Sequence, residues 1–456
     1  MIASFKNKRT NIKSYFTKGE ARSVNAKRNI VLSFAIKGLN IFIGLLLVPL
    51  TINYVDKTQY GIWLTLSSII GWFSFFDIGF GNGLRNKFAE AVATGKHKLA
   101  RIYVSTTYAI LTIVIGFVLL IFLVVNPFLN WSSILNTSQS MAPQLSMLAL
   151  IVFAFFCVQF ILQLLTTVLT ANQQPAKAAL FNFLANLISL FIIFVLTKTT
   201  SGNLLYLGIS LGFTPVLVLL VSNIWFYAHS YRKYAPSFHL IRLRYAKKLT
   251  GVGLKFFIIQ VAAIILFQCN NIIIAQLFGP EEVTPYNIAF KYFGIVTMIA
   301  AIVMTPFWSA FTDAWHRKDY VWIKNVIRKL QKFWLIISCL ALVLLIISNF
   351  AYKIWVGEKI NVSFNVSLLM TLNVIIITWN MIYVQFLNGI GKIQLQLYSG
   401  VFGTILIIPL TIILAKNFEI AGVVLSSCIL GLVNTSWTYI QYKKIINQTA
   451  KGIWNK

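Results

Sequence analysis

The sequence predicts an all-α integral membrane protein with about 12 transmembrane helices in two six-helix lobes. Three observations predict this class. Of the 456 residues, 58% are hydrophobic and 11% are charged, whereas soluble domains carry about 25% charged residues. Apolar segments of membrane-spanning length recur along the whole chain, and most of the net charge of +29 falls in alternate loops between them. The composition therefore excludes a disordered chain, a secreted disulfide scaffold and a typical soluble enzyme.

Twelve segments satisfy the requirement for a spanning helix, which is about 20 mostly apolar residues. They are 30–53, 61–83, 102–125, 147–171, 178–197, 204–227, 254–277, 286–310, 333–354, 367–387, 396–415 and 420–442. Several exceed the minimum length, which permits tilted helices.

The basic residues orient these helices. Of the 39 Lys and Arg residues, 32 lie in the N-terminal segment, in alternate loops and in the C-terminal tail, and the opposite loops hold 5. Because cytoplasmic loops retain Lys and Arg, we expect both termini in the cytoplasm. The basic segment 1–29, the linker 228–253 and the tail 443–456 all belong to this side. The bilayer accounts for the charge, so nucleic acid is not an expected partner.

The predicted lobes, 30–227 and 254–442, carry signs of an internal repeat. In each lobe an outer turn enters an apolar helix that ends in a polar run, and Tyr60 to Glu90 spans the same thirty positions as Tyr286 to His316. Six helices are an even number, so both lobes start on the same side and the repeats are parallel. Chance similarity between apolar helices is the alternative interpretation.

The sequence contains no motif for a metal, a cofactor or catalysis. Each of the four cysteines lies alone in an apolar segment, and the four histidines lie apart in short polar loops. A zinc site needs several such ligands together, and an ATP-driven chain needs the phosphate-binding G-x-x-x-x-G-K-[ST] loop. We therefore predict a non-enzyme without metal or cofactor.

Two short runs carry a family resemblance. The first, Y-V-D-K-T-Q-Y-G-I-W, is followed by the second, F-F-D-I-G-F-G-N-G-L-R-N-K-F-A-E-A. Together they resemble the polysaccharide-exporter branch of the multidrug/oligosaccharidyl-lipid/polysaccharide exporter superfamily, in which an outer turn enters helix 2 at a Y-G-x-W-like start and this helix ends in a D-x-G-x-G-like run. The corresponding residues here are Tyr60, Gly61, Trp63, Asp77, Gly79 and Gly81.

The resemblance implies a function. Similar proteins are O-antigen (Wzx-like) and capsule flippases of the bacterial inner membrane. They move undecaprenyl-pyrophosphate-linked oligosaccharides across this membrane. We expect this chain to move such a substrate from the cytoplasmic to the periplasmic leaflet by alternating access of its two lobes, driven by an ion gradient or by consumption of the substrate outside. Glycosyltransferases and a polymerase are the partners that such a pathway implies.

Two lysines lie inside predicted spans, where a charged group is costly and suggests a function. Lys37 shares one face of the first helix with Asn40, which predicts that both face a water-filled cavity; snorkelling of Lys37 to the headgroups is the alternative. Lys291 lies near the outer end of the eighth helix. The resemblance implies that cations of helices 1 and 8 bind the anionic headgroup. Arg85 ends the second helix, where it either receives the pyrophosphate or marks the boundary.

Asp77 is the one acid in a predicted span. It either binds a coupling H⁺ or Na⁺ or neutralises Lys37, since a partner charge alone satisfies the cost of burial.

Amides in the predicted helices suggest a lining for sugar hydroxyls. Gln260 and Asn271 share one face of the seventh helix, and Asn380 shares a face of the tenth with Asn373. Amides both donate and accept hydrogen bonds; interhelical hydrogen bonding is the alternative role.

Two rival functions remain. A multidrug or organic-ion antiporter of the same superfamily is expected to bury acids for cationic drugs, whereas this chain places one acid and two lysines in its spans. A membrane polysaccharide polymerase is expected to have large charged outer loops, yet the longest predicted outer loop, 126–146, has no charged residue.

Overall fold

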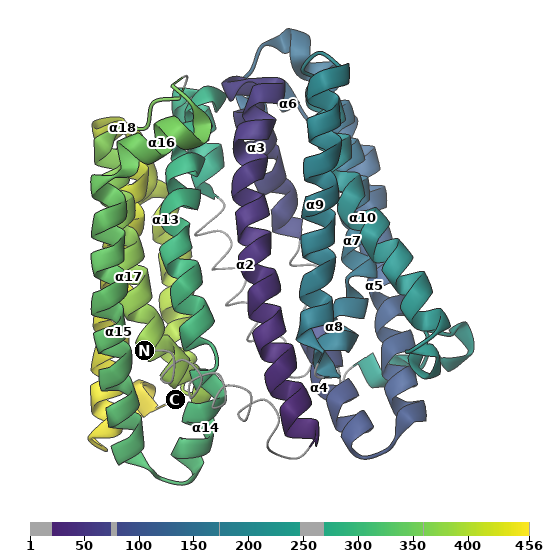
Figure 1. Ribbon diagram of the computed structural model, residues 1–456, viewed down its shortest axis with the longest axis vertical. Coiled ribbons are helices and arrows are strands. Elements are labelled where there is room, and N and C mark those ends of the chain that lie inside the picture. Colours follow the sequence, from purple (N-terminus) through teal and green to yellow (C-terminus); the bar gives the residue numbers. More distant parts are fainter. Residues whose placement is uncertain (1–20, 74–79, 173, 247–268, 359, 456) are drawn as a thin grey trace, which may run out of the picture. The chain divides into compact units, whose positions relative to one another are not determined.

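The computed structural model describes residues 21–73, 80–172, 174–246, 269–358 and 360–455. Every regular element in these ranges is a helix (Figure 1), which confirms the all-α class. Asp77, Gln260 and most of the predicted N-terminal segment lie outside the described residues.

The chain divides into two compact units. Unit 1 comprises the described residues of 21–50, 80–129 and 146–246, and unit 2 comprises those of 51–73, 130–145 and 269–455. Thus two short segments from the first third of the chain pack with the later residues.

Unit 1 is a bundle of long helices, followed after α10 by three short 3-10 helices. Its elements are most of α2 (Ala21–Val55), α4 (Phe80–Ala93), α5 (His97–Val125), η2 (Asn126–Phe128), most of α7 (Ala142–Leu162), α8 (Leu164–Ala171), α9 (Pro175–Thr199), α10 (Leu204–Ala228), η4 (Arg232–Tyr234), η5 (Phe238–Leu240) and η6 (Leu243–Tyr245). Pro175 occupies the first turn of α9, where its missing N–H costs nothing. Asn203 caps α10 by accepting from the backbone N–H of Leu205.

Aromatic and amide contacts hold these helices together. The rings of Phe122 on α5 and Phe153 on α7 stack with centroids 4.1 Å apart. Asn186 on α9 donates to the side-chain oxygen of Asn40 on α2 at 2.9 Å. Both contacts join segments far apart in the chain.

Unit 2 contains the remaining elements. They are α3 (Lys57–Gly71), α6 (Trp131–Leu135), η3 (Gln139–Met141), the short helix Cys269–Phe278, η7 (Pro280–Glu282), α13 (Val283–Met304), α14 (Phe307–His316), α15 (Tyr320–Ile346), α16 (Ser348–Val356), α17 (Phe364–Gly389), α18 (Gln394–Ile446) and η8 (Gly452–Asn455). Helix α17 packs on α13, α14, α15 and α18, so it lies at the centre of this unit.

Helix α18 is two helices joined at a sharp reversal. Phe418 and Glu419 have non-helical backbone angles, with φ of 53° and ψ of −141° at Glu419. A Cβ at Gly422 would lie 2.1 Å from the carbonyl oxygen of Leu414, so the chain returns closely on itself. The reversal falls between the predicted helices 396–415 and 420–442.

Nine helices in the described ranges are long and apolar enough to cross a membrane. Helix α3 has 15 residues, which is less than the usual spanning length. The multi-helix membrane class is therefore confirmed, and the count of twelve spans stays a prediction.

Candidate functional site

The candidate site is a cavity of about 300 Å³ in unit 1, beside Lys37. Its lining residues belong to the five helices α2, α7, α8, α9 and α10 and to the junction of α7 with α8. Six of its ten lining residues are polar or charged, and the full lining is Lys37, Gln159, Gln163, Thr166, Thr170, Pro175, Ala178, Ala179, Asn182 and Leu219.

Four of these polar residues form one stripe, Gln159, Gln163, Thr166 and Thr170. Their spacing of four, three and four residues places them on a single helix face. Helix α7 passes into α8 at Gln163, and the amide N–H of Gln163 still donates to the carbonyl of Gln159 at 2.9 Å. The near-continuous helix therefore keeps the four side chains in line.

Hydroxyl and amide groups in this stripe differ in their hydrogen bonding. Thr166 donates to the carbonyl of Gln163 and Thr170 to that of Thr166, each at 2.7 Å. Within the part of the chain that the structure describes, the side-chain amides of Gln159, Gln163 and Asn182 make no hydrogen bond. The amides are thus available to a ligand in the cavity, while the threonine oxygens keep lone pairs to accept.

Lys37 supplies the charge of the cavity. Its side chain is exposed, and neither an ion pair with it nor an acidic residue in the lining occurs among the described residues. An ammonium beside amides and hydroxyls can bind an anion as a point charge. Lys37 thus lines a cavity together with Gln159, Gln163 and Asn182, three residues that the sequence analysis did not single out, and its predicted role in binding stays a prediction.

Asn40 has a different environment. Its side-chain oxygen accepts the hydrogen bond from Asn186, so it joins α2 to α9, and it does not line the cavity. Its predicted contact with sugar stays a prediction.

Lys291, the second candidate cation, lies in unit 2. It is half-buried on α13, and its ammonium donates to the hydroxyl of Tyr60 at 2.9 Å and lies 5.7 Å from the centre of that ring. The tyrosine of the Y-G-x-W run therefore holds this lysine through a hydrogen bond and a cation–π contact.

Gly61, the next residue of that run, permits the close packing of α3. A Cβ on it would lie 1.7 Å from the carbonyl oxygen of Pro280 in η7. Any larger residue must therefore separate α3 from η7.

Asn271 lies in a buried chain of polar side chains. It donates to the hydroxyl of Ser68 at 2.7 Å, and its own oxygen accepts from Asn287 at 2.9 Å. These contacts join α3, the helix 269–278 and α13, which is the interhelical role named above. Its predicted role in sugar binding stays a prediction.

Asn380 lines a smaller cavity of about 150 Å³ between α17 and α18. Its oxygen accepts from Thr438 at 2.8 Å, whereas the buried oxygen of neighbouring Asn373 has no hydrogen-bond partner among the described residues. Both asparagines line this cavity, and the predicted contact of Asn380 with sugar stays a prediction.

Arg85 is exposed on α4, and the structure does not distinguish between its two predicted roles. On the same helix Lys87 pairs with Glu90 at 2.7 Å, and this hydrogen bond raises the pKa of the Lys87 ammonium. Asp77 and Gln260, the other two candidates, lie outside the described residues.

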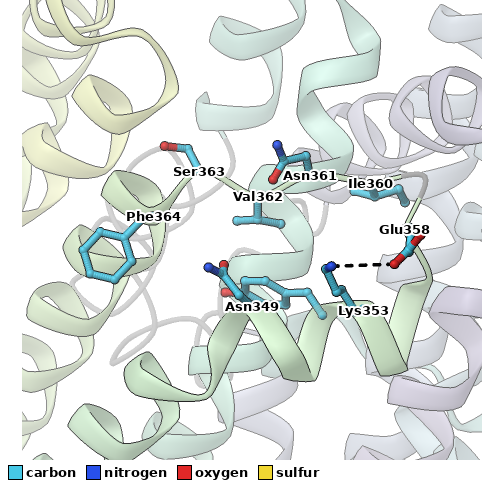
Figure 2. A pocket seen from close by; sticks show the side chains of 9 residues that line it. Asn349, Lys353, Glu358, Ile360, Asn361, Val362, Ser363 and Phe364 are labelled. Carbon is cyan, nitrogen blue, oxygen red and sulfur yellow. Dashed lines mark ion pairs between the residues drawn. The ribbon is translucent and has the colours of Figure 1, made fainter.

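A larger hollow of about 680 Å³ lies in unit 2 around the ends of α16 and α17. Figure 2 shows Lys353 and Glu358 directed toward each other there, with 3.6 Å between the ammonium and a carboxylate oxygen. Both are well exposed. Because its two charged groups neutralise each other, this hollow is a weaker anion site than the cavity at Lys37.

The helical fold defines a class of protein, the multi-pass membrane proteins. The structure resembles an inward-facing multidrug resistance MATE family transporter of the MOP superfamily with a TM-score of 0.70 at 12% identity, covering 92% of this chain and 96% of that one. It also resembles an outward-facing transporter of that family, with a TM-score of 0.62 at 14% identity, covering 94% and 96%. Within this class, the chain belongs to the polysaccharide biosynthesis protein family, whose profile matches residues 26–311.

Two relatives are named for O-antigen. An O-antigen export protein of Yersinia pseudotuberculosis is 22% identical over 410 residues, which is 88% of this chain and 91% of the relative. An O-antigen transporter of Salmonella typhimurium is 23% identical over 56% of this chain and 58% of the relative. The predicted family is confirmed, and the chain is a multi-pass membrane protein of that family.

Proposed function

We propose that this protein is a flippase for an undecaprenyl-pyrophosphate-linked oligosaccharide, an O-antigen or capsule repeat unit. The observation that carries the proposal is the cavity of unit 1, where Lys37 stands beside the amides of Gln159, Gln163 and Asn182 and two threonine hydroxyls. This combination suits a ligand with an anionic group next to sugar hydroxyls. The O-antigen relatives support the same substrate class.

The chemistry divides between the charge and the neutral groups. A lipid pyrophosphate carries at least two negative charges, and Lys37 offers a cation without a carboxylate partner among the described residues. Amides and hydroxyls hydrogen-bond the sugar, while the polyprenyl chain remains in the lipid. In this proposal Lys291 supplies a second cation, Arg85 receives the pyrophosphate at the cytoplasmic mouth, and Asn40, Gln260, Asn271 and Asn380 contact sugar.

The transport cycle follows from the predicted topology. Twelve helices with both termini in the cytoplasm form two lobes, which alternately open the substrate site to each side. An H⁺ or Na⁺ gradient drives the cycle through Asp77, or the removal of substrate outside does so. Glycosyltransferases supply the substrate and a polymerase consumes it.

The direct test is transport of labelled undecaprenyl-pyrophosphate oligosaccharide in proteoliposomes. We expect Lys37→Ala to reduce transport by about tenfold or more, since losing one charge-assisted contact costs about 1.5–3 kcal/mol. We expect a smaller loss for Lys291→Ala, and Lys37→Arg should retain part of the activity because it keeps the charge. Lys198→Ala is the matched control, since Lys198 lies exposed in the last turn of α9 and lines no described cavity.

Unchanged transport in both alanine variants would remove the lysines from the binding site. Transport of a cationic drug, with no transport of the lipid-linked sugar, would favour the multidrug antiporter instead. Coupling has its own test: collapse of the proton or sodium gradient should slow the parent protein, and this sensitivity should disappear in Asp77→Asn. If Asp77→Asn responds to gradient collapse as the parent does, Asp77 is structural.

A further inference from the structure

The segment that follows α10, residues 232–245, combines cations with exposed apolar side chains. It contains Arg232, Lys233, Arg242 and Arg244 and no acidic residue. Phe238 is 91% exposed and Leu243 is 65% exposed. An apolar pair displayed among four cations is the pattern of a surface that binds anionic lipid.

Hydrogen bonds hold this segment against the start of α5. The backbone N–H of Ser237 donates to the hydroxyl of Ser105 at 3.0 Å, and that of Arg242 donates to the hydroxyl of Thr106 at 3.1 Å. Arg101 donates to the carbonyl of Ala235 at 2.8 Å. The segment is thus fixed to unit 1, and Phe238 is displayed by a structured loop.

The anchoring points lie near the predicted start of a membrane span. Ser105 and Thr106 are buried in α5 near the beginning of its predicted span, 102–125. Trp225, which is 54% exposed, lies in the last turn of α10 just before the segment, and tryptophan gathers at the headgroup level. Both elements meet at the same end of unit 1 (Figure 1).

Two of the cations already lie over aromatic rings. The ammonium of Lys233 lies 5.0 Å from the ring of Tyr234, and the guanidinium of Arg244 lies 5.1 Å from that of Tyr245. All four cationic residues of the segment are exposed. At the edge of a bilayer the available counter-charge is lipid phosphate.

We propose that residues 232–245 bind the surface of an anionic phospholipid leaflet. Phe238 and Leu243 insert at the boundary between headgroups and acyl chains, and the four cations contact lipid phosphates. Binding of this segment would hold the end of unit 1 that carries residues 232–245 at the membrane surface.

The experiment places a nitroxide spin label at single cysteines in the full-length protein. Cys157, Cys269, Cys339 and Cys428 are first replaced, and Phe238→Cys, Leu243→Cys and His239→Cys are then made one at a time. The protein is reconstituted in vesicles of phosphatidylglycerol and phosphatidylethanolamine. The ratio of label collisions with oxygen, which partitions into lipid, to those with a water-soluble nickel chelate reports immersion.

We expect this ratio to be severalfold higher at 238 and 243 than at 239, which is exposed on the same turn and serves as the matched control. Replacing phosphatidylglycerol by phosphatidylcholine, or introducing Arg242→Gln with Arg244→Gln, should lower the ratio at 238. Equal ratios at all three positions would overturn the proposal and leave the segment free for a protein partner. Immersion without dependence on phosphatidylglycerol would overturn the anionic assignment. The readout is lipid contact, so it is independent of the transported substrate.

Discussion

Lys37 and Asn40 stand one turn apart on α2 and meet different surroundings. The helical period was enough to place both on one face, and Lys37 does reach a polar cavity. Asn40 instead pairs with Asn186, which lies 146 positions further along the chain. Sequence period predicts the face of a helix, whereas the partner across the interface depends on tertiary packing.

The sequence spacing of four cavity residues could have predicted that they share a helix face, but they were not among the candidate site residues. A spacing of four, three and four residues separates Gln159, Gln163, Thr166 and Thr170. This spacing predicts four polar side chains on one face of an otherwise apolar helix, and such a face suggests a polar cavity. Asn182 gave no comparable signal, because it contributes to the cavity through the packing of α9 beside α8.

Gly61 provides a test at the scale of one atom. Gly61→Ala places a methyl group 1.7 Å from the Pro280 carbonyl oxygen if nothing moves, so α3 must shift at a cost of about 1–3 kcal/mol. We expect a lower unfolding temperature in detergent, measured by thermal-shift fluorescence. Gly116→Ala is the control, because a Cβ there meets nothing within 4 Å. An equal effect in both variants would contradict the close packing of α3 on η7.

At the scale of elements, apolar length predicted most helices and local chemistry explained their ends. Pro175 and Asn203 start α9 and α10 as their residue types suggest. The predicted helix 61–83 is described in part, with α3 over Lys57–Gly71 and α4 from Phe80, and residues 74–79 lie outside the described residues.

The reversal in α18 offers a prediction for one element. Glu419 is exposed and has a φ of 53° with an extended ψ, a combination that is essentially restricted to glycine. We expect Glu419→Gly to increase the free energy of unfolding by about 1 kcal/mol, and Glu419→Ala to bring no such gain. Denaturant unfolding of the two variants in the same detergent checks this difference. Equal stability of the glycine and alanine variants would show that the backbone at 419 is not strained.

At the scale of the whole molecule, composition and loop charge predicted a multi-pass membrane protein, and the nine candidate spans in the described ranges agree with that class. The family was predicted from the resemblance of two short runs, and the family match confirms it. Chain order was less informative about packing, because residues 51–73 and 130–145 group with the later part of the chain. Such grouping depends on packing between segments hundreds of positions apart, for which apolar periodicity carries no signal. Movement of two lobes relative to each other during transport stays a prediction.

The predicted orientation can be measured on intact cells. In a cysteine-free background, Thr94→Cys should be protected from a membrane-impermeant maleimide, because this loop belongs to the basic, cytoplasmic set. Ser138→Cys should react, because the uncharged loop 126–146 belongs to the outer set. Permeabilised cells, in which both positions should react, provide the control. The reverse pattern of labelling would invert the orientation and place both termini outside.

Four of the hydrogen bonds between helices should be insensitive to pH and to salt. The pairs Asn40–Asn186, Ser68–Asn271, Asn380–Thr438 and Thr411–Ser426 involve only neutral side chains, which do not titrate between mild acid and mild alkali. Their strength is also insensitive to salt, which weakens contacts between charges. A change in transport with pH or ionic strength should therefore report on charged groups and not on these four neutral contacts. The charged groups include Lys37, Lys291, Asp77, the substrate and the Lys57–Glu282 ion pair between α3 and η7.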